Sequence, residues 1–155
     1  MTSTLTPIQR ARRQSMHGPR FAPGYCARDV RELFLAPSSG DADGDSDADA
    51  VDVFLRAPAT LRHRVTLDQL DAGYIFPREV PLLFAGGSHG NGHAVVTTGY
   101  GRGFDSKLWS PDTRRAGYFD RVTLGDVLRW MSHSSPLGWV ESLGGQRLPV
   151  RYVKR

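Results

Sequence analysis

The chain has 155 residues, a net charge of +4 and a hydrophobic fraction of 39%, which predicts one domain large enough to bury a core. No apolar run is long enough to cross a bilayer, and the first eight residues lack the apolar segment of a secretory signal peptide. A single cysteine excludes an internal disulfide, and Cys/His spacing of the zinc type is absent. The positive charge suits anionic partners, but it is not clustered with aromatic residues, so nucleic acid is not the expected partner.

The N-terminal segment is predicted to be a short basic helix over residues 5–16. Gly18 and Pro19 follow it and end the helical pattern. We therefore divide the chain into a basic leader, residues 1–20, and a single domain, residues 21–153.

The next stretch carries the only cysteine. Cys26, Val30 and Leu33 recur with Phe34 at the spacing of one face of a helix, after the break made by a Pro-Gly pair. Cys26 therefore falls in the first turn of a helix, where unpaired N–H groups and the helix dipole stabilise a thiolate. A buried structural cysteine is the alternative interpretation, since free cysteines are among the most buried residues.

Residues 38–52 form an aspartate-rich, low-complexity insertion. A calcium loop of the EF-hand type starting at Asp41 would need glycine at its sixth position and glutamate at its twelfth. Ser46 and Asp52 stand there instead. We therefore interpret the segment as a flexible acidic surface insertion, with no metal site and no cofactor predicted.

The rest of the chain alternates short helical and strand patterns. Glycine and proline clusters separate these patterns, and residues 51–61 show no clear pattern. In chain order we first expect a turn of helix at 65–70 with Thr66 as N-cap, and then a strand at 79–84 with Pro81 at a strand start or sheet edge. A strand at 93–98 and its hairpin partner at 105–110, ended by Pro111, follow. The last elements are a helix at 122–131 with Thr123 as N-cap and two strands at 137–143 and 147–153 around Gly144-Gly145. Helices that precede a set of short antiparallel strands predict an α+β domain.

A cysteine nucleophile needs a base, normally histidine. His17, His63 and His133 are expected at the surface, and His89 lies in a glycine-rich loop that would hold a base poorly. His93 differs because it starts a strand directly after Gly92, where a substrate or another backbone can approach. His93 is therefore the preferred base.

The combination of these motifs resembles the papain-like cell-wall hydrolases, the CHAP (cysteine, histidine-dependent amidohydrolase/peptidase) and related families. The resemblance covers residues 21–150 and is greatest to the short actinobacterial and actinophage members. The motifs that carry it are Gly24-Tyr-Cys26, Val80-Pro-Leu-Leu-Phe84, Gly86-Gly-Ser-His-Gly-Asn-Gly-His-Ala-Val-Val96, Leu108-Trp-Ser-Pro-Asp112 and Gly138-Trp-Val-Glu141. It implies a papain-like fold in which the helix bearing the cysteine packs on a small antiparallel sheet.

The resemblance also implies site residues. Cys26 would be the nucleophile and His93 the base, and the third group would come from the following strand, where Asp112 is favoured over Ser110. Tyr25, beside the nucleophile, would donate a hydrogen bond or form a wall of the cleft. His89, Trp109 and Ser110 complete the expected substrate-binding set.

The expected function is cleavage of a peptidoglycan amide bond by a Cys/His mechanism, as an amidase or endopeptidase. The partner would be bacterial peptidoglycan, with other virion proteins as further partners, and the protein would reside in a phage virion or be delivered to the host wall. One alternative is a non-catalytic virion, tail or wall-binding module with the same fold. Another is a basic nucleic-acid-binding protein, in which Cys26 has no role.

Overall fold

The computed structural model describes residues 5–21, 26–36, 50–86, 92–98, 107–112, 115–130 and 135–150, with only the backbone of Asp112 and Ala116. These residues form helices and strands in an α+β arrangement, which confirms the predicted class. The helices are α1 (Pro7–Ser15), α2 (Cys26–Leu33), α3 (Ala50–Arg56), the 3-10 turn η1 (Ala59–Leu61), α4 (Leu67–Asp71) and α5 (Leu124–Trp130). The strands are β1 (Arg62–Arg64), β2 (Pro81–Ala85), β3 (His93–Thr97), β4 (Leu108–Asp112), β5 (Ala116–Val122), β6 (Ser135–Val140), β7 (Ser142–Leu143) and β8 (Gln146–Arg147).

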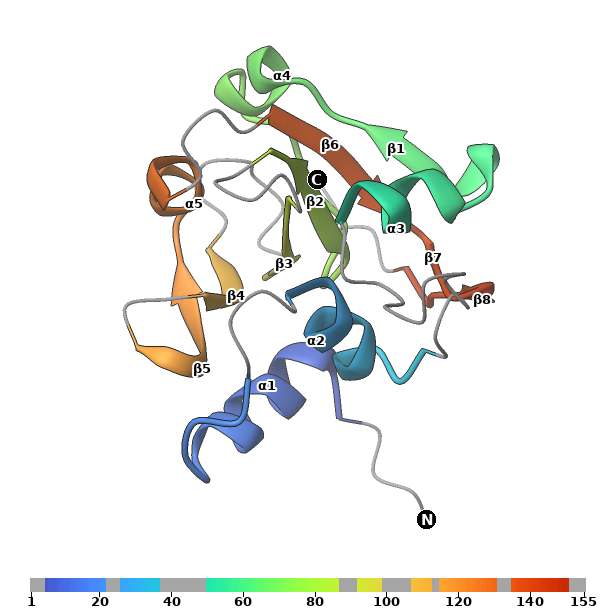
Figure 1. Cartoon of the computed structure of the whole chain (residues 1–155). Helices are drawn as coiled ribbons and strands as arrows, with labels where there is room; N and C mark the ends of the chain where they lie inside the picture. The colour runs from blue at the N-terminus through green and yellow to red at the C-terminus, as the bar shows by residue number, and fades with distance from the viewer. Residues whose placement is uncertain are drawn as a thin grey trace.

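A sheet runs through the middle of the molecule (Figure 1). In the part of the chain that the structure describes, it has six strands in the order β1-β6-β2-β3-β4-β5, and all its pairs are antiparallel. Strands β2 to β5 form a meander, whereas β6 inserts between β1 and β2. A separate two-stranded ribbon, β7-β8, turns at Gly144 and Gly145, both with positive φ, and the predicted turn is confirmed. The strand bounds differ from the prediction: the strand expected over 137–143 is divided between β6 and β7, and residues 148–150, expected in the last strand, are not part of one.

Helices cover both faces of the sheet. Side chains from α1, α2 and α3 pack with Leu83, Ala94 and Val96 in one apolar cluster. Side chains from α4 and α5 pack with Leu82 and Val95 in the other. Because neighbouring strand residues point to opposite faces, the two clusters mark the two sides of the sheet.

The first helix belongs to the packed core. Ala11 is fully buried in the same cluster as α2, and the Ser15 hydroxyl donates to the Phe119 carbonyl and accepts from its N–H. At the other end of α1, the Ile8 N–H donates to the Glu79 carboxylate at 2.9 Å. The segment expected as a basic leader is thus joined to the domain along the length of α1.

Several predicted boundaries are correct and others are not. The Thr66 cap is present with its reciprocal partner Gln69, and Thr123 likewise exchanges hydrogen bonds with Asp126. Pro81 begins β2, which lies inside the sheet and not at its edge. The expectation that Pro111 ends its strand is wrong, because β4 continues to Asp112 through a register shift that accommodates the missing N–H.

Candidate active site

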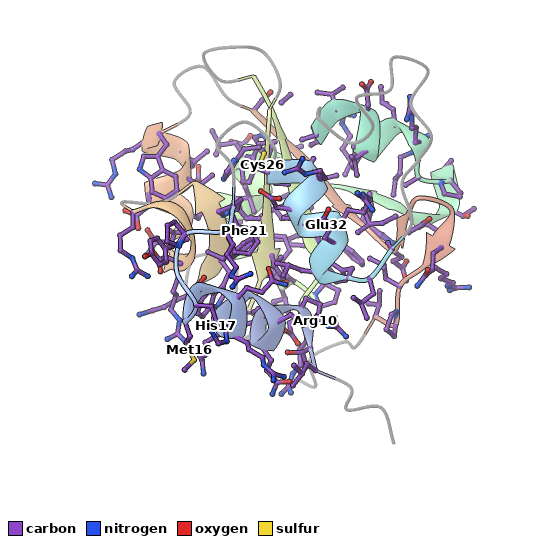
Figure 2. The ribbon with its side chains drawn as sticks, turned by 60° about the horizontal axis from the view of Figure 1, so that its bottom comes forward. Arg10, Met16, His17, Phe21, Cys26 and Glu32 are labelled. Carbon is purple, nitrogen blue, oxygen red and sulfur yellow. The ribbon has the colours of Figure 1, made fainter. Side chains whose placement is uncertain are left out.

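The helix α2 begins at Cys26, as predicted, and packs against β3 and β4. Cys26, Val30 and Leu33 are buried on one side of this helix, and Phe34 packs against the same cluster. Figure 2 shows Cys26 at one end of α2 and Glu32 towards the other. The cysteine residue is only 3% exposed. The thiol is therefore placed at a helix start but is enclosed by the surrounding structure.

His93 begins β3, and the residue before it must be glycine. Gly92 has φ +76°, and a Cβ atom there would lie 2.2 Å from the Phe84 carbonyl oxygen. The close approach of another backbone, expected from the Gly-His pair, is thus present, and it comes from the neighbouring strand β2. This contact fixes the position at which the His93 side chain leaves the sheet.

His93 is paired with a side chain from the next strand. Its Nε2 atom lies 2.7 Å from the Ser110 hydroxyl oxygen on β4. His93 is 3% exposed and Ser110 fully buried, so water competes little for this hydrogen bond. The bond holds the imidazole by one of its two ring nitrogens, Nε2.

Cys26 and His93 are not hydrogen-bonded to each other in the described residues. Ala94 and Val96 point towards α2, whereas Val95 lies in the opposite cluster. By the alternation along β3, His93 points to the side of Val95, where its partner Ser110 also lies. The thiol and the imidazole therefore start from different sides of the sheet, and they can meet only beyond the end of β3.

Of the other predicted site residues, one contacts His93, and several have side chains that are not described. Ser110, the second choice for the third group, is the residue that contacts His93. Asp112 lies on β4 two residues further on, and only its backbone is described. Tyr25 and His89 lie outside the described residues, as does the insertion up to residue 49.

Trp109 is 7% exposed and faces the cluster that contains Cys26. The guanidinium carbons of Arg12 and Arg121 each lie 5.5 Å from its ring centroid. Its indole N–H is buried and has no hydrogen-bond partner among the described residues. Trp109 thus lies where α1, β4 and β5 meet, and two cation–π contacts connect it to α1 and β5.

A second polar cluster was missed at the sequence level. His63, expected at the surface, is stacked on Trp139 with ring centroids 3.8 Å apart. Its Nε2 lies 2.5 Å from a carboxylate oxygen of Glu141, and the Trp139 indole donates to the Tyr74 hydroxyl at 2.8 Å. The signal was weak because Arg62-His-Arg64 lacks the apolar alternation of a strand, although it pairs with β6.

The described residues contain no group of three or more acidic, histidine or cysteine side chains arranged to hold a metal ion. Within those same ranges, none of the helices has the length and apolar character required to span a membrane. Comparison with family models, with curated proteins and with solved structures finds no match to this chain. Function must therefore be argued from the residues themselves.

Proposed function

We propose that this chain is a papain-like cysteine hydrolase that cleaves an amide bond of the peptidoglycan peptide. The observation that carries the proposal is the buried hydrogen bond between His93 and Ser110. The two residues belong to β3 and β4, the strands on which the helix that begins with the only cysteine packs from the other side. A thiol at a helix start, a histidine and a polar group that orients it are the three parts of a cysteine nucleophile site. The resemblance in the Gly-His and Trp-Ser-Pro-Asp motifs supports the same assignment.

In this mechanism the Cys26 thiolate attacks the amide carbonyl carbon, and a carbon–sulfur bond forms. The N–H groups at the start of α2 are suited to stabilise the resulting oxyanion. The protonated His93 gives its proton to the leaving amine as the carbon–nitrogen bond breaks. Water then loses a proton to His93 and attacks the thioester, which releases the acid and restores the thiol.

Ser110 would act as a positioning residue. By holding Nε2 of the imidazole, its hydroxyl would fix the orientation of the ring. The proposal requires His93 to approach Cys26 beyond the end of β3, because the two are not hydrogen-bonded in the described structure. Catalytic hydrogen bonds are often long or misaligned without substrate and tighten in the substrate complex.

Peptidoglycan as substrate is supported by the resemblance and by the net charge of +4, which favours an anionic wall. The same argument supports residence in a phage virion or delivery to the host wall, with other virion proteins as neighbours.

A second candidate is a non-catalytic wall-binding or virion module. The burial of Cys26, at 3% exposed, and the position of His93 on the opposite side of the sheet favour it. A buried thiol away from a base is unreactive, because the thiolate is the nucleophile. The two functions therefore differ in thiol reactivity and in turnover.

The decisive experiment is turbidity clearing of purified peptidoglycan from several hosts by the wild type, Cys26→Ala and His93→Ala, with mass spectrometry of the released fragments. If the chain is a cysteine hydrolase, the wild type clears the walls and neither variant does. New amine ends on the released fragments then identify the amide bond that is cleaved. Iodoacetamide labelling of Cys26 should then be faster than labelling of glutathione. A folded wild type that clears no wall, with a thiol slower than glutathione, would assign the chain to the non-catalytic module.

A further inference from the structure

A hollow of about 520 Å³ lies where α1 ends, and it is separate from the candidate active site. Its lining residues are Arg13, Gln14, His17 and Arg20, and we call it the α1-turn pocket. Figure 2 shows His17 at the end of α1, well away from Cys26. The proposed hydrolase mechanism uses none of these four residues.

The turn that forms one wall of the pocket is fixed on β5. Gly18 has φ +105°, a conformation that glycine adopts without strain. The N–H groups of Arg20 and Phe21 both donate to the Gly117 carbonyl, at 2.8 and 3.1 Å. A Cβ atom on Gly117 would lie 2.6 Å from the Pro19 Cβ, so the contact requires glycine at this position. The backbone of this turn is therefore held in place against β5.

The pocket is positively charged. Its lining has two guanidinium groups, an imidazole and an amide, and no carboxylate. On the neighbouring strand β5, the Asp120 carboxylate accepts two hydrogen bonds from the Arg115 guanidinium, which balances its charge. Arg12 and Arg121 add two more positive charges at the junction of α1 and β5. Such a field favours an anionic ligand.

We propose that the α1-turn pocket binds a phosphate group carried on a hydroxylated unit, such as a sugar or polyol phosphate. The planar donors of Arg13 and Arg20 match the geometry of phosphate oxygens. The Gln14 amide both donates and accepts, which suits the hydroxyl groups of the attached unit. All four lining residues are exposed, so the site is open to solvent and accessible to such a ligand. This inference does not depend on the proposed hydrolase activity.

The test is a titration of the ¹⁵N-labelled full chain with glycerol 3-phosphate, followed by amide chemical shifts. We expect saturable shifts confined to residues 13–21 and 115–121. The double variant Arg13→Gln/Arg20→Gln should weaken binding by about tenfold or more, because two charge-assisted hydrogen bonds are lost. Arg147→Gln, the same change at an exposed position on β8, should leave the affinity unchanged.

A second arm distinguishes a free metabolite from a polymer as the source of the phosphate. A soluble poly(glycerol phosphate) that binds more tightly per phosphate than the monomer identifies a polymer, and equal affinity identifies the monomer. Glycerol without phosphate should not bind. The proposal is overturned if neither phosphate ligand binds, or if Arg147→Gln weakens binding as much as the double variant. Preferential binding of duplex DNA that depends on all the arginines alike would also overturn it.

Discussion

The His93 imidazole and the Ser110 hydroxyl are joined by a 2.7 Å contact between neighbouring strands. Both residues are buried, and they project on the side of the sheet that packs against α4 and α5. A histidine held in this way has the orientation of its ring set by its partner. The pair is therefore the part of the proposed site for which the chain's own geometry makes sharp predictions.

Replacing Ser110 by alanine should lower peptidoglycan cleavage by about tenfold or more, because the imidazole loses the group that orients it. The pH–rate profile of clearing should also change, because the hydroxyl group that contacts the imidazole is removed. The measurement is the initial clearing rate between pH 5 and 9. A merely structural serine would change the protein's melting temperature without moving the profile.

The matched control is Ser142→Ala. Ser142 is also buried, but it lies on β7, outside the six-stranded sheet. Its replacement should leave the pH–rate profile unchanged. If the two alanine variants have the same pH–rate profile, Ser110 does not position His93 for catalysis.

A second prediction concerns Asp112, which the sequence favoured as the third group. Asp112→Asn should retain activity close to that of the wild type if Ser110 orients His93, since the asparagine keeps the size of the side chain. Both variants are compared in the same clearing assay. If Asp112→Asn loses most of its clearing activity while Ser110→Ala remains active, the Asp112 carboxylate is the group that orients His93.

The sequence predicted the elements whose signals are local. The cysteine helix is evident from its apolar face, and the caps at Thr66 and Thr123 come from side chains that bond within their own first turn. The strand of His93 is evident from its β-branched run. In each case the residues that determine the structure are neighbours in the chain.

What could not be predicted depends on contacts between distant segments. Strand β1 is polar and exists because β6 pairs with it, and β6 in turn lies between β1 and β2. The relation of His93 to Ser110 depends on the register of β3 and β4 and on the irregularity between Ser110 and Asp112. Sequence spacing alone cannot specify which of those two side chains reaches the histidine.

The close contact between β1 and β6 predicts that substitution of Gly138 destabilises the fold. This residue has φ +138°, and a Cβ atom there would lie 2.0 Å from the His63 carbonyl oxygen. Gly138→Ala should therefore destabilise the fold by about 1–3 kcal/mol in thermal or urea denaturation. The stacking of His63 on Trp139 should be disturbed as well, which tryptophan fluorescence would report.

The matched control is Gly125→Ala. Gly125 lies in α5, and the nearest atom to its added Cβ would be 3.8 Å away, an ordinary contact. Alanine should stabilise this helix by up to about 1 kcal/mol. If Gly125→Ala destabilises the protein as much as Gly138→Ala, the close approach of β1 is not what makes Gly138 necessary.

The start of α5 gives a prediction about pH. The Asp126 carboxylate accepts from the Thr123 N–H at 3.0 Å and from Arg129 at 2.5 Å, and these bonds, chiefly the first, lower its pKa. A carboxyl whose pKa is lowered on folding stabilises the protein above its unfolded pKa of about 3.9. That contribution is lost as the pH falls through the lower, folded pKa.

Asp126→Asn should therefore melt at a lower temperature than the wild type at pH 7, and the difference should shrink towards pH 3. Thr123→Ala removes the reciprocal hydrogen bond to the Asp126 N–H without removing a charge. It should lower the stability by about 1 kcal/mol at pH 7. Thermal denaturation of the three proteins across this range checks both expectations. A difference between the wild type and Asp126→Asn that is the same at pH 7 and pH 3 would show that ionised Asp126 does not stabilise α5.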